Sequence, residues 1–152
     1  MNIASWVVDT NVLFEGLTQK GGAPGLLIDA WIADNLQVCV SNALAYEYVD
    51  VLSRKLSASR WERLKPVLGA LLDQAQFVVI YYSWRPTSPD PCDDHVIDCA
   101  MNASARIITS NTRDFQSAQE SLGLQVFTPT EAMSYLETGE NQFCGCRPVA
   151  RT

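Results

Sequence analysis

The sequence predicts an α/β fold, a small doubly wound parallel sheet of about five strands with helices on both faces. Short apolar runs typical of buried strands alternate with longer amphipathic runs typical of helices over most of the 152 residues. This alternation favours a parallel sheet, because parallel neighbours need a helical crossover between them. The length suits one domain, which we place at residues 1–137, followed by a flexible tail at residues 138–152 without periodicity.

The first part of the chain supplies two strand patterns and two helix patterns. Residues 3–8 form a short apolar run that predicts the first strand. Residues 24–34 predict a helix opened by a proline after the Gly21-Gly22 turn. Residues 36–40 are rich in β-branched side chains and predict the second strand. Ser41 is a good N-cap for a helix that ends near residue 56.

The middle of the chain predicts two further helices around a third strand. Ser59 and Glu62 have the spacing of a capping box and start a helix to about residue 74, with a kink or break at Pro66. The third strand is expected at residues 77–81. After a proline-rich loop, Asp90 caps a helix that begins at Pro91 and ends at about residue 104.

The last predicted elements are two strands and a helix. Residues 106–109 and 125–127 predict the fourth and fifth strands. Thr128 and Glu131 form a second capping box around Pro129, which predicts a final helix ending near residue 137.

Composition and charge exclude several classes of protein. No apolar run approaches the roughly 18 to 20 residues of a membrane span, and no secretory signal is visible, so we expect a cytoplasmic protein without a membrane partner. The net charge of −6 argues against a broad basic surface that binds nucleic acid unselectively. A local basic run is either a solvated helical face or a phosphate-contacting edge. It consists of Arg54, Lys55, Arg60, Arg63 and Lys65.

The cysteines do not indicate a zinc site, because none of the spacings among the five of them matches a zinc motif. Cys39 and Cys99 fall in a strand pattern and a helix pattern, where a free thiol packs as a small apolar group. Cys144 and Cys146, in the predicted tail, are best interpreted as reduced thiols.

Four separated acidic residues stand where a parallel sheet can bring them together. Asp9 and Asp114 follow predicted strands, and Glu47 and Asp93 fall on helical patterns. Ligands of such sheets bind beyond the carboxyl ends of the strands. Four gathered negative charges repel one another unless cations bind or pKa values shift. The pattern therefore suggests a metal site.

Helical phase separates the acids of the helix expected from Pro91. Asp93 projects onto the middle of the apolar stripe, where a carboxylate is costly unless it is paired or bound to metal. First-turn stabilisation by the helix dipole would explain its position but not its burial. Asp94 falls on the flank, as a candidate to support the metal ligands or to bind a second metal. Asp98 falls on the far side, and Asp90 is explained as the N-cap.

Glu47 lies at the margin of the apolar face of its helix, where it can reach a site or remain a solvated surface residue. Asp50 projects away from that face and has Arg54 four residues on, the spacing of an exposed ion pair. His95 is the only histidine, which disfavours a histidine-rich zinc site. No serine has a credible base partner, and no phosphate loop or dinucleotide motif is present.

Four segments in order resemble the motifs of PIN-domain nucleases, over roughly residues 3 to 136. Each motif alone is weak, whereas four in register are specific. The segments are Val7-Val8-Asp9-Thr10-Asn11-Val12-Leu13, then Val40-Ser41 with Tyr46-Glu47-Tyr48 and Val51-Leu52, then Asp90-Pro91-Cys92-Asp93-Asp94 with Ala100, and Ile108-Thr109-Ser110-Asn111-Thr112-Arg113-Asp114-Phe115.

The resemblance implies a Mg²⁺- or Mn²⁺-dependent ribonuclease of a VapC-like kind. Many such proteins are toxins that an antitoxin protein neutralises, and many are homodimers. By position, the acidic quartet of the family corresponds to Asp9, Glu47, Asp93 and Asp114. Its supporting polar positions correspond to Thr10, Asn11 and Thr109. Asn111 stands where many relatives have an aspartate.

The roles of the acids follow from the chemistry of hard cations, which prefer oxygen ligands. We assign Asp9 and Asp93 as direct ligands and Glu47 as a ligand or a water-orienting base. Asp114 would serve an outer position, for a second ion or one recruited with the substrate.

Other classes fit the sequence less well. A phosphatase of the haloacid dehalogenase type needs an aspartate where this chain has Asn11, and a response-regulator receiver needs an acidic pair at the first strand. The remaining alternative is a non-catalytic PIN-like module that binds RNA or protein. Retention of all four acids favours catalysis over that alternative.

Overall fold

A computed structural model of the chain describes residues 4–19, 21–83 and 93–145, and of Asp93 and residues 139–145 it describes the backbone only. The elements, in chain order, are β1 (Ser5–Val8), α1 (Thr10–Thr18), α2 (Ala23–Ile32), β2 (Gln37–Val40), α3 (Asn42–Lys55), α4 (Ala58–Gln74), β3 (Gln76–Phe77), α5 (Asp93–Ala103), β4 (Arg106–Ile108), the 3-10 helix η1 (Thr112–Phe115), α6 (Gln116–Leu122), β5 (Val126–Phe127) and α7 (Pro129–Gly145).

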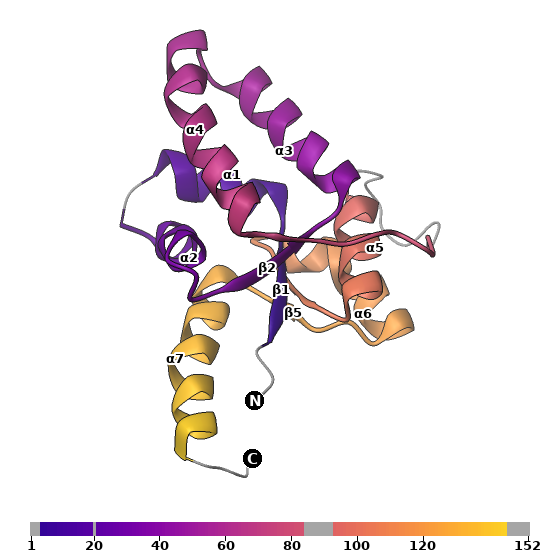
Figure 1. The fold of residues 1–152 in the computed structure, drawn as a ribbon. Helices are drawn as coiled ribbons and strands as arrows, with labels where there is room; N and C mark the ends of the chain where they lie inside the picture. The colour runs from indigo at the N-terminus through magenta and orange to yellow at the C-terminus, as the bar shows by residue number, and fades with distance from the viewer. Residues whose placement is uncertain (1–3, 20, 84–92, 146–152) are drawn as a thin grey trace.

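The five strands form one sheet in the order β3-β2-β1-β4-β5. Every pairing is parallel, which confirms the predicted fold class. The helix α5 packs against β1, β2 and β4, and α2 packs against α1, α4 and α7. Figure 1 shows α5 and α6 on one side of the sheet and α2, α4 and α7 on the other. Within the described residues, no helix is both long and apolar enough to cross a bilayer.

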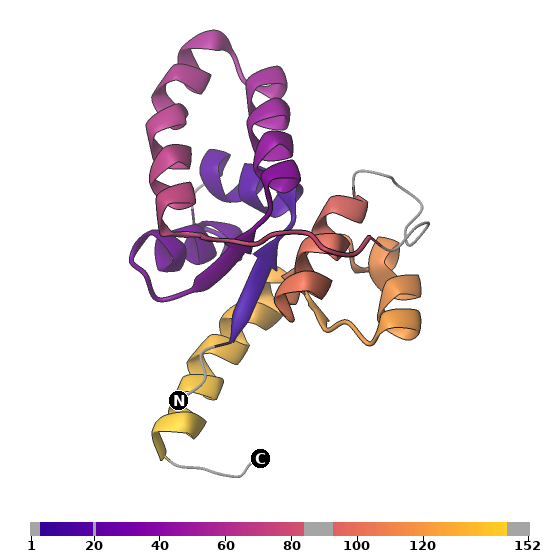
Figure 2. The ribbon, with the colours of Figure 1, turned by 45° about the vertical axis from the view of Figure 1, so that its right-hand side comes forward.

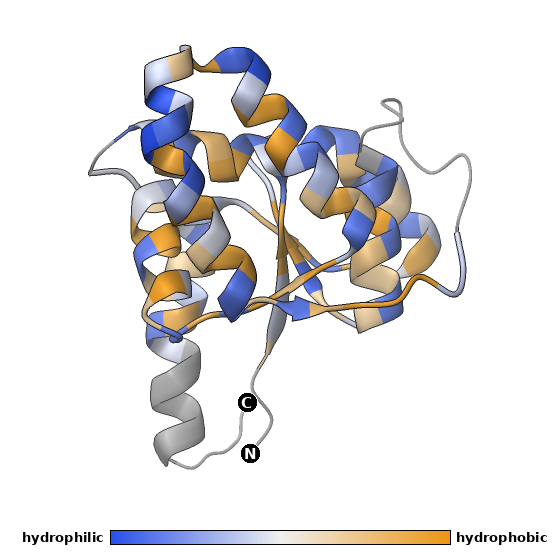
Figure 3. Ribbon diagram, turned by 45° about the horizontal axis from the view of Figure 1, so that its top comes forward, coloured by the Kyte–Doolittle hydropathy of each residue, from blue (hydrophilic) through white to orange (hydrophobic). Residues whose placement is uncertain are grey.

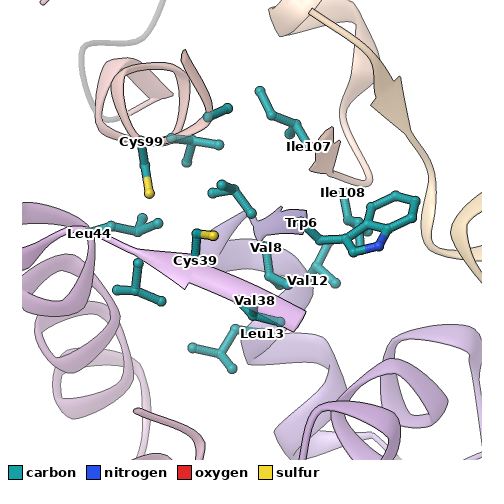
Figure 4. Packing of buried hydrophobic residues seen from close by; sticks show 14 of the residues in the cluster. Trp6, Val8, Val12, Leu13, Val38, Cys39, Leu44, Cys99, Ile107 and Ile108 are labelled. Carbon is teal, nitrogen blue, oxygen red and sulfur yellow. The ribbon is translucent and has the colours of Figure 1, made fainter. Parts of the chain in front are cut away.

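The core lies between the sheet and its helices and is built from the apolar runs that predict the strands. Residues of β1, β2 and β4 are buried almost completely. The strands are mainly apolar, whereas the helices carry polar residues on their outer faces (Figure 3). Figure 4 shows the strand residues Val8, Val38 and Ile107 beside Leu44 of α3 and Cys99 of α5. Both faces of the three central strands are therefore shielded from water, whereas the short edge strand β3 is exposed.

The predicted caps of two helices are confirmed. Ser41 Oγ accepts a hydrogen bond from the backbone N–H of Leu44, at 3.2 Å, and caps α3. At α7 the N–H of Thr128 donates to Glu131 Oε1 at 2.9 Å, and the N–H of Glu131 donates to Thr128 Oγ1 at 3.1 Å. This reciprocal pair is the capping box expected from the sequence.

The predicted start of α4 is wrong by two residues. Ser57, and not Ser59, is the N-cap, because its hydroxyl accepts from the N–H of Arg60 at 3.3 Å. The expected break at Pro66 does not occur, and α4 continues through this residue. Pro66 and Glu62 are both exposed, so the carbonyl that loses its helical partner can be hydrated.

The third strand is shorter than predicted because a side chain draws the chain away from the sheet. One further sheet hydrogen bond, from Val78 N to Val40 O at 3.0 Å, follows β3. Beyond it, Asn102 of α5 accepts from the N–H of Tyr81 at 2.9 Å and donates to the carbonyl of Tyr82 at 2.9 Å. The segment 78–83 therefore crosses over α5 instead of extending the sheet.

Three helical segments are absent from the sequence-based prediction, and a fourth is longer than predicted. The helices α1 and α6 and the short η1 were not anticipated. The last helix, predicted to end near residue 137 before a tail at 138–152, continues to Gly145. Residues 146–152 lie outside the described part of the chain.

Candidate active site

Asp9 lies where β1 ends, beside the end of the neighbouring strand β4. Its N–H donates to the carbonyl of Ile108 at 2.9 Å, which continues the strand pairing up to the acid. Thr109 Oγ1 donates to Asp9 Oδ2 at 2.7 Å, across a sequence separation of 100 residues. Asp9 is 4% exposed and Thr109 is fully buried. A buried carboxylate is thus held by a hydroxyl from the adjacent strand.

Glu47 reaches the same region from α3. Thr10, the first residue of α1, donates through Oγ1 to Glu47 Oε2 at 2.5 Å. Glu47 is half-buried. Of the two alternatives for this residue, a site residue or a solvated surface acid, the contact with Thr10 supports the former. Each of the two acids is therefore oriented by a threonine hydroxyl from a different element.

Tyr48 lies beneath these acids and was not recognised from the sequence as a site residue. Its side chain is fully buried, and its hydroxyl donates to the carbonyl of Val8 at 2.5 Å. Burial raises the pKa of Tyr48 well above its ordinary value, with smaller contributions from Cys99, Asp9 and Glu47. A signal was present, since a tyrosine within the apolar stripe of α3 needs a partner for its hydroxyl.

Asp114 is joined to Asp9 by a chain of hydrogen bonds. Asn111 donates through its backbone N–H to Thr109 Oγ1 at 3.0 Å and through Nδ2 to Asp114 Oδ2 at 2.6 Å. Because Thr109 in turn donates to Asp9, the loop after β4 links both acids. Next to this chain, Ser110 Oγ donates to Glu15 Oε1 of α1 at 2.9 Å. The segment that follows β4 is therefore bound both to Asp9 at the end of β1 and to the helix α1.

The helix α5 differs from its expected burial pattern. Asp98, predicted to project to the far side, is only 4% exposed, and Asp94, predicted on the flank, is 5% exposed. The far side of α5 is covered by the segment 78–83 that Asn102 holds. Asp93 begins α5, but its side chain lies outside the described residues, as do Asp90 and Cys92. Asn11 is exposed on the first turn of α1.

The donor set at this end of the sheet fits a hard divalent cation in kind. The polar groups near Asp9 are carboxylate and hydroxyl oxygens, which Mg²⁺ and Mn²⁺ prefer. Among the side chains that the structure describes, no three of the His, Cys, Asp and Glu type form a metal-holding group. Asp9, Glu47 and Asp114 therefore do not form such a metal-holding group by themselves.

The thiols of the core take no part in this region as nucleophiles. Cys39 and Cys99 are both free and buried. Burial raises the pKa of Cys99 to about 12, with a smaller contribution from Cys39, and burial also raises the pKa of Cys39. A thiol that keeps its proton at neutral pH packs as an apolar group, as the sequence indicates for both.

Comparison with known families and curated proteins gives one match and one negative result. A family model described as PIN domain matches residues 5–114, which include Asp9, Glu47, Asp93 and Asp114. A comparison with curated proteins finds no match. The matched segment spans β1 to η1 and so includes both strand ends described above.

Solved structures share the fold at low sequence identity. VapBC2 from Rickettsia felis, bound to a DNA fragment from its promoter, is 12% identical, with a TM-score of 0.58 over 82% of this chain and 98% of that chain. FitAcB from Neisseria gonorrhoeae is 20% identical, with a TM-score of 0.59 over 82% and 98%. DNA-bound VapBC from Salmonella typhimurium is 13% identical, with a TM-score of 0.59 over 84% and 99%.

Proposed function

The chain belongs to the PIN domain family, and from this premise we propose that it is a divalent-metal-dependent endoribonuclease. One observation carries the proposal. Asp9 and Glu47, far apart in sequence, each accept a hydrogen bond from a threonine hydroxyl, and Thr10, which binds Glu47, directly follows Asp9 in the chain. Two carboxylates in one region, one of them almost fully buried, are costly to keep charged unless a cation offsets their charge.

The residues proposed to hold Mg²⁺ or Mn²⁺ are Asp9 and Asp93 as direct ligands and Glu47 as a ligand or water-orienting base. When bound, such an ion lowers the pKa of a water and offsets charge on phosphoryl oxygens. The protein's part is to fix the acids before substrate arrives, through Thr109 on Asp9 and Thr10 on Glu47. Asp114, positioned by Asn111, is proposed for a second or substrate-recruited ion.

We further propose that this nuclease is the toxin of a toxin–antitoxin pair and acts in the cytoplasm on RNA. Support comes from the fold shared with VapBC and FitAcB assemblies. A homodimer is proposed as well, supported by two exposed apolar side chains on α3. Tyr46 is 78% exposed and Val49 is 39% exposed. Light scattering of the purified chain would test the homodimer. Growth of cells after induced expression would test the toxin role.

The nuclease proposal is tested by incubating the purified protein with single-stranded RNA. Cleavage is expected with Mn²⁺ or Mg²⁺ and should cease with EDTA. Asp9→Asn and Asp93→Asn should each abolish turnover while the Tm stays unchanged or rises, because charge repulsion is relieved. Cleavage of RNA at the wild-type rate by either variant would contradict the assignment of that aspartate as a metal ligand.

Asp50→Asn is the matched control. Asp50 is also an acid of this domain, but it is exposed and lies 3.0 Å from Arg54 in a surface ion pair. Its loss should leave both cleavage and Tm close to those of the wild type. RNA binding without cleavage by the wild-type protein would support the non-catalytic alternative instead.

A further inference from the structure

The turn between α3 and α4 carries a concentrated group of basic side chains. Five of the chain's 11 Lys and Arg residues lie there, although the net charge of the chain is −6. All five are exposed. Figure 2 shows α3 and α4 as a hairpin whose turn projects away from the sheet. These residues are Arg54 and Lys55 at the end of α3 and Arg60, Arg63 and Lys65 at the start of α4.

Ion pairs divide this group into two sets. Arg54 Nη2 lies 3.0 Å from Asp50 Oδ2, and Lys65 Nζ lies 3.1 Å from Glu62 Oε2, so both charges are offset locally. The other three side chains form no ion pair with any residue that the structure describes. We call this second set, Lys55, Arg60 and Arg63, the basic tip.

Lys55 connects the basic tip to the acidic site. Its Nζ lies 5.1 Å from the centroid of the Phe14 ring on α1. One turn earlier on α1, Thr10 donates to Glu47. Both contacts join α1 to α3, so Lys55 and Glu47 face the same helix. Eight residues of helix separate them by about 12 Å, which a few nucleotides of extended backbone can span.

Resting on the proposed ribonuclease function, we propose that the basic tip binds the phosphate backbone of single-stranded RNA beside the acidic site. The acids at the strand ends and the negative chain as a whole repel RNA, so a substrate strand needs cations next to the reacting phosphate. Arg60 and Arg63 can each donate two hydrogen bonds to one phosphate, and Lys55 supplies a point charge.

An acidic protein segment is the competing occupant, but the position of Lys55 favours RNA. Its contact with Phe14 directs the ammonium group along the side of α3 that Glu47 shares. A strand that crosses the acidic site and continues along α1 would pass this group. The two ion-paired cations lack such a connection, because their partners lie on their own helices.

The test compares two double variants that each remove one cation from α3 and one from α4. Binding of an oligouridylate of about 15 nucleotides is measured by fluorescence anisotropy in EDTA at several salt concentrations. Lys55→Gln with Arg63→Gln should raise the Kd about tenfold and reduce the slope of log K against log salt by about 1.4, for two lost phosphate contacts. The Tm should fall by no more than a few degrees, because both side chains are exposed and only the contact of Lys55 with Phe14 is lost.

Arg54→Gln with Lys65→Gln is the control, since it removes the same number of charges from the same helices. Its Kd should stay within about twofold of the wild type, because Asp50 and Glu62 already offset these cations. Equal weakening of RNA binding in the two double variants would show that only the net charge matters. This result would overturn the proposed role of the basic tip. Wild-type affinity in the Lys55 and Arg63 pair would overturn it as well.

Three further outcomes separate this inference from its rivals. Poly-L-glutamate at equal charge should displace the oligouridylate poorly; equal displacement would assign the basic tip to an acidic protein segment and overturn the RNA inference. Absence of cleavage by the wild type would defeat the proposed function. If the wild type cleaves RNA but the double variant at Lys55 and Arg63 keeps the wild-type affinity, only the proposed role of the basic tip is contradicted.

Discussion

The hydroxyl of Tyr48 donates to the carbonyl of Val8 at 2.5 Å and so ties α3 to the last residue of β1. The two residues are 40 positions apart in sequence, and each is the neighbour of a site acid, Glu47 for Tyr48 and Asp9 for Val8. One buried contact therefore fixes the relative position of the two elements that carry the acids. Tyr48 acts as a positioning residue beneath the site.

Tyr48→Phe should destabilise the protein by about 1 to 3 kcal/mol, because a buried carbonyl loses a hydrogen-bond donor while the ring volume is retained. Urea unfolding monitored by circular dichroism would measure this loss as a lower midpoint with an unchanged slope. RNA cleavage measured well below the new Tm should also decline, because Asp9 and Glu47 lose a common anchor.

Tyr81→Phe is the control, a tyrosine outside the site. Its side chain is 78% exposed, so removal of its hydroxyl should change the free energy of unfolding by less than about 0.5 kcal/mol. Identical unfolding midpoints for the Tyr48 and Tyr81 variants would show that the contact with Val8 contributes nothing measurable.

Because the thiol of Cys99 is buried, we expect the free energy of unfolding to decrease at alkaline pH. Burial raises its pKa from 9.0 to about 12, so the folded state keeps a proton that the unfolded chain releases. This contribution is complete below about pH 9 and is lost as the pH rises towards 12, by on the order of 4 kcal/mol in total. Cys99→Ala should therefore show a flatter decline of Tm between about pH 9 and 11 than the wild type.

Thermal unfolding at closely spaced pH values would measure both profiles. Cys99→Ala also removes buried volume, so its Tm at neutral pH should already be lower. The informative quantity is the difference in slope, because a cavity alone shifts the whole curve. Parallel profiles for the two proteins would refute the proposed role of the Cys99 proton.

The sheet and Asp9 lie where local sequence signals predict them, whereas the local pattern leaves Glu47 open and its assignment rests on the family resemblance. Apolar runs mark β1, β2 and β4 because these central strands are buried on both faces, and Asp9 directly follows such a run. The caps of α3 and α7 were also predictable, because Ser41 and Thr128 bond to backbone groups three residues away. These features depend on residues that are close together in the sequence. They can therefore be recognised from one sequence alone.

What escaped prediction depends on contacts between distant segments. Asp98 was expected in solvent, but the segment 78–83 covers its side of α5, held by Asn102 across about twenty residues. The helix α1 was not predicted, although Asp9, its N-cap residue, is of a type that often caps helices. In the structure the Asp9 side chain makes no capping hydrogen bond to α1, and its carboxylate accepts from Thr109. A residue that takes part in a site does not always form the capping hydrogen bond that the local sequence predicts.

Gly16 should tolerate no side chain. A Cβ there would lie 2.4 Å from Ile28 Cγ1 and 2.7 Å from the carbonyl oxygen of Pro24, where α1 and α2 meet. Gly16→Ala should cost about 1 to 3 kcal/mol, since backbone must move to relieve the clash. Gly69→Ala in α4, where nothing lies within 4 Å, should instead stabilise the fold by up to about 1 kcal/mol. Equal changes in Tm would contradict the close packing of α1 on α2.

Thr109→Val separates the hydroxyl from the shape of this buried residue. The hydroxyl donates to Asp9 and accepts from the N–H of Asn111, so its loss leaves the carboxylate less constrained and the backbone group without its acceptor. Because a hydrogen bond to a charged group contributes about 1.5 to 3 kcal/mol, kcat/KM for RNA should fall by at least about tenfold.

The rescue variant Thr109→Ser distinguishes positioning of Asp9 from general destabilisation. Serine restores the hydroxyl but removes a buried methyl group, so it should lower the Tm while keeping most of the activity. Valine should lower kcat/KM and raise the Mn²⁺ concentration needed for half-maximal activity, with Mn²⁺ affinity checked independently by calorimetry. If serine and valine reduce kcat/KM equally, in proportion to their loss of stability, the hydroxyl of Thr109 does not orient Asp9, because packing alone would then account for both results.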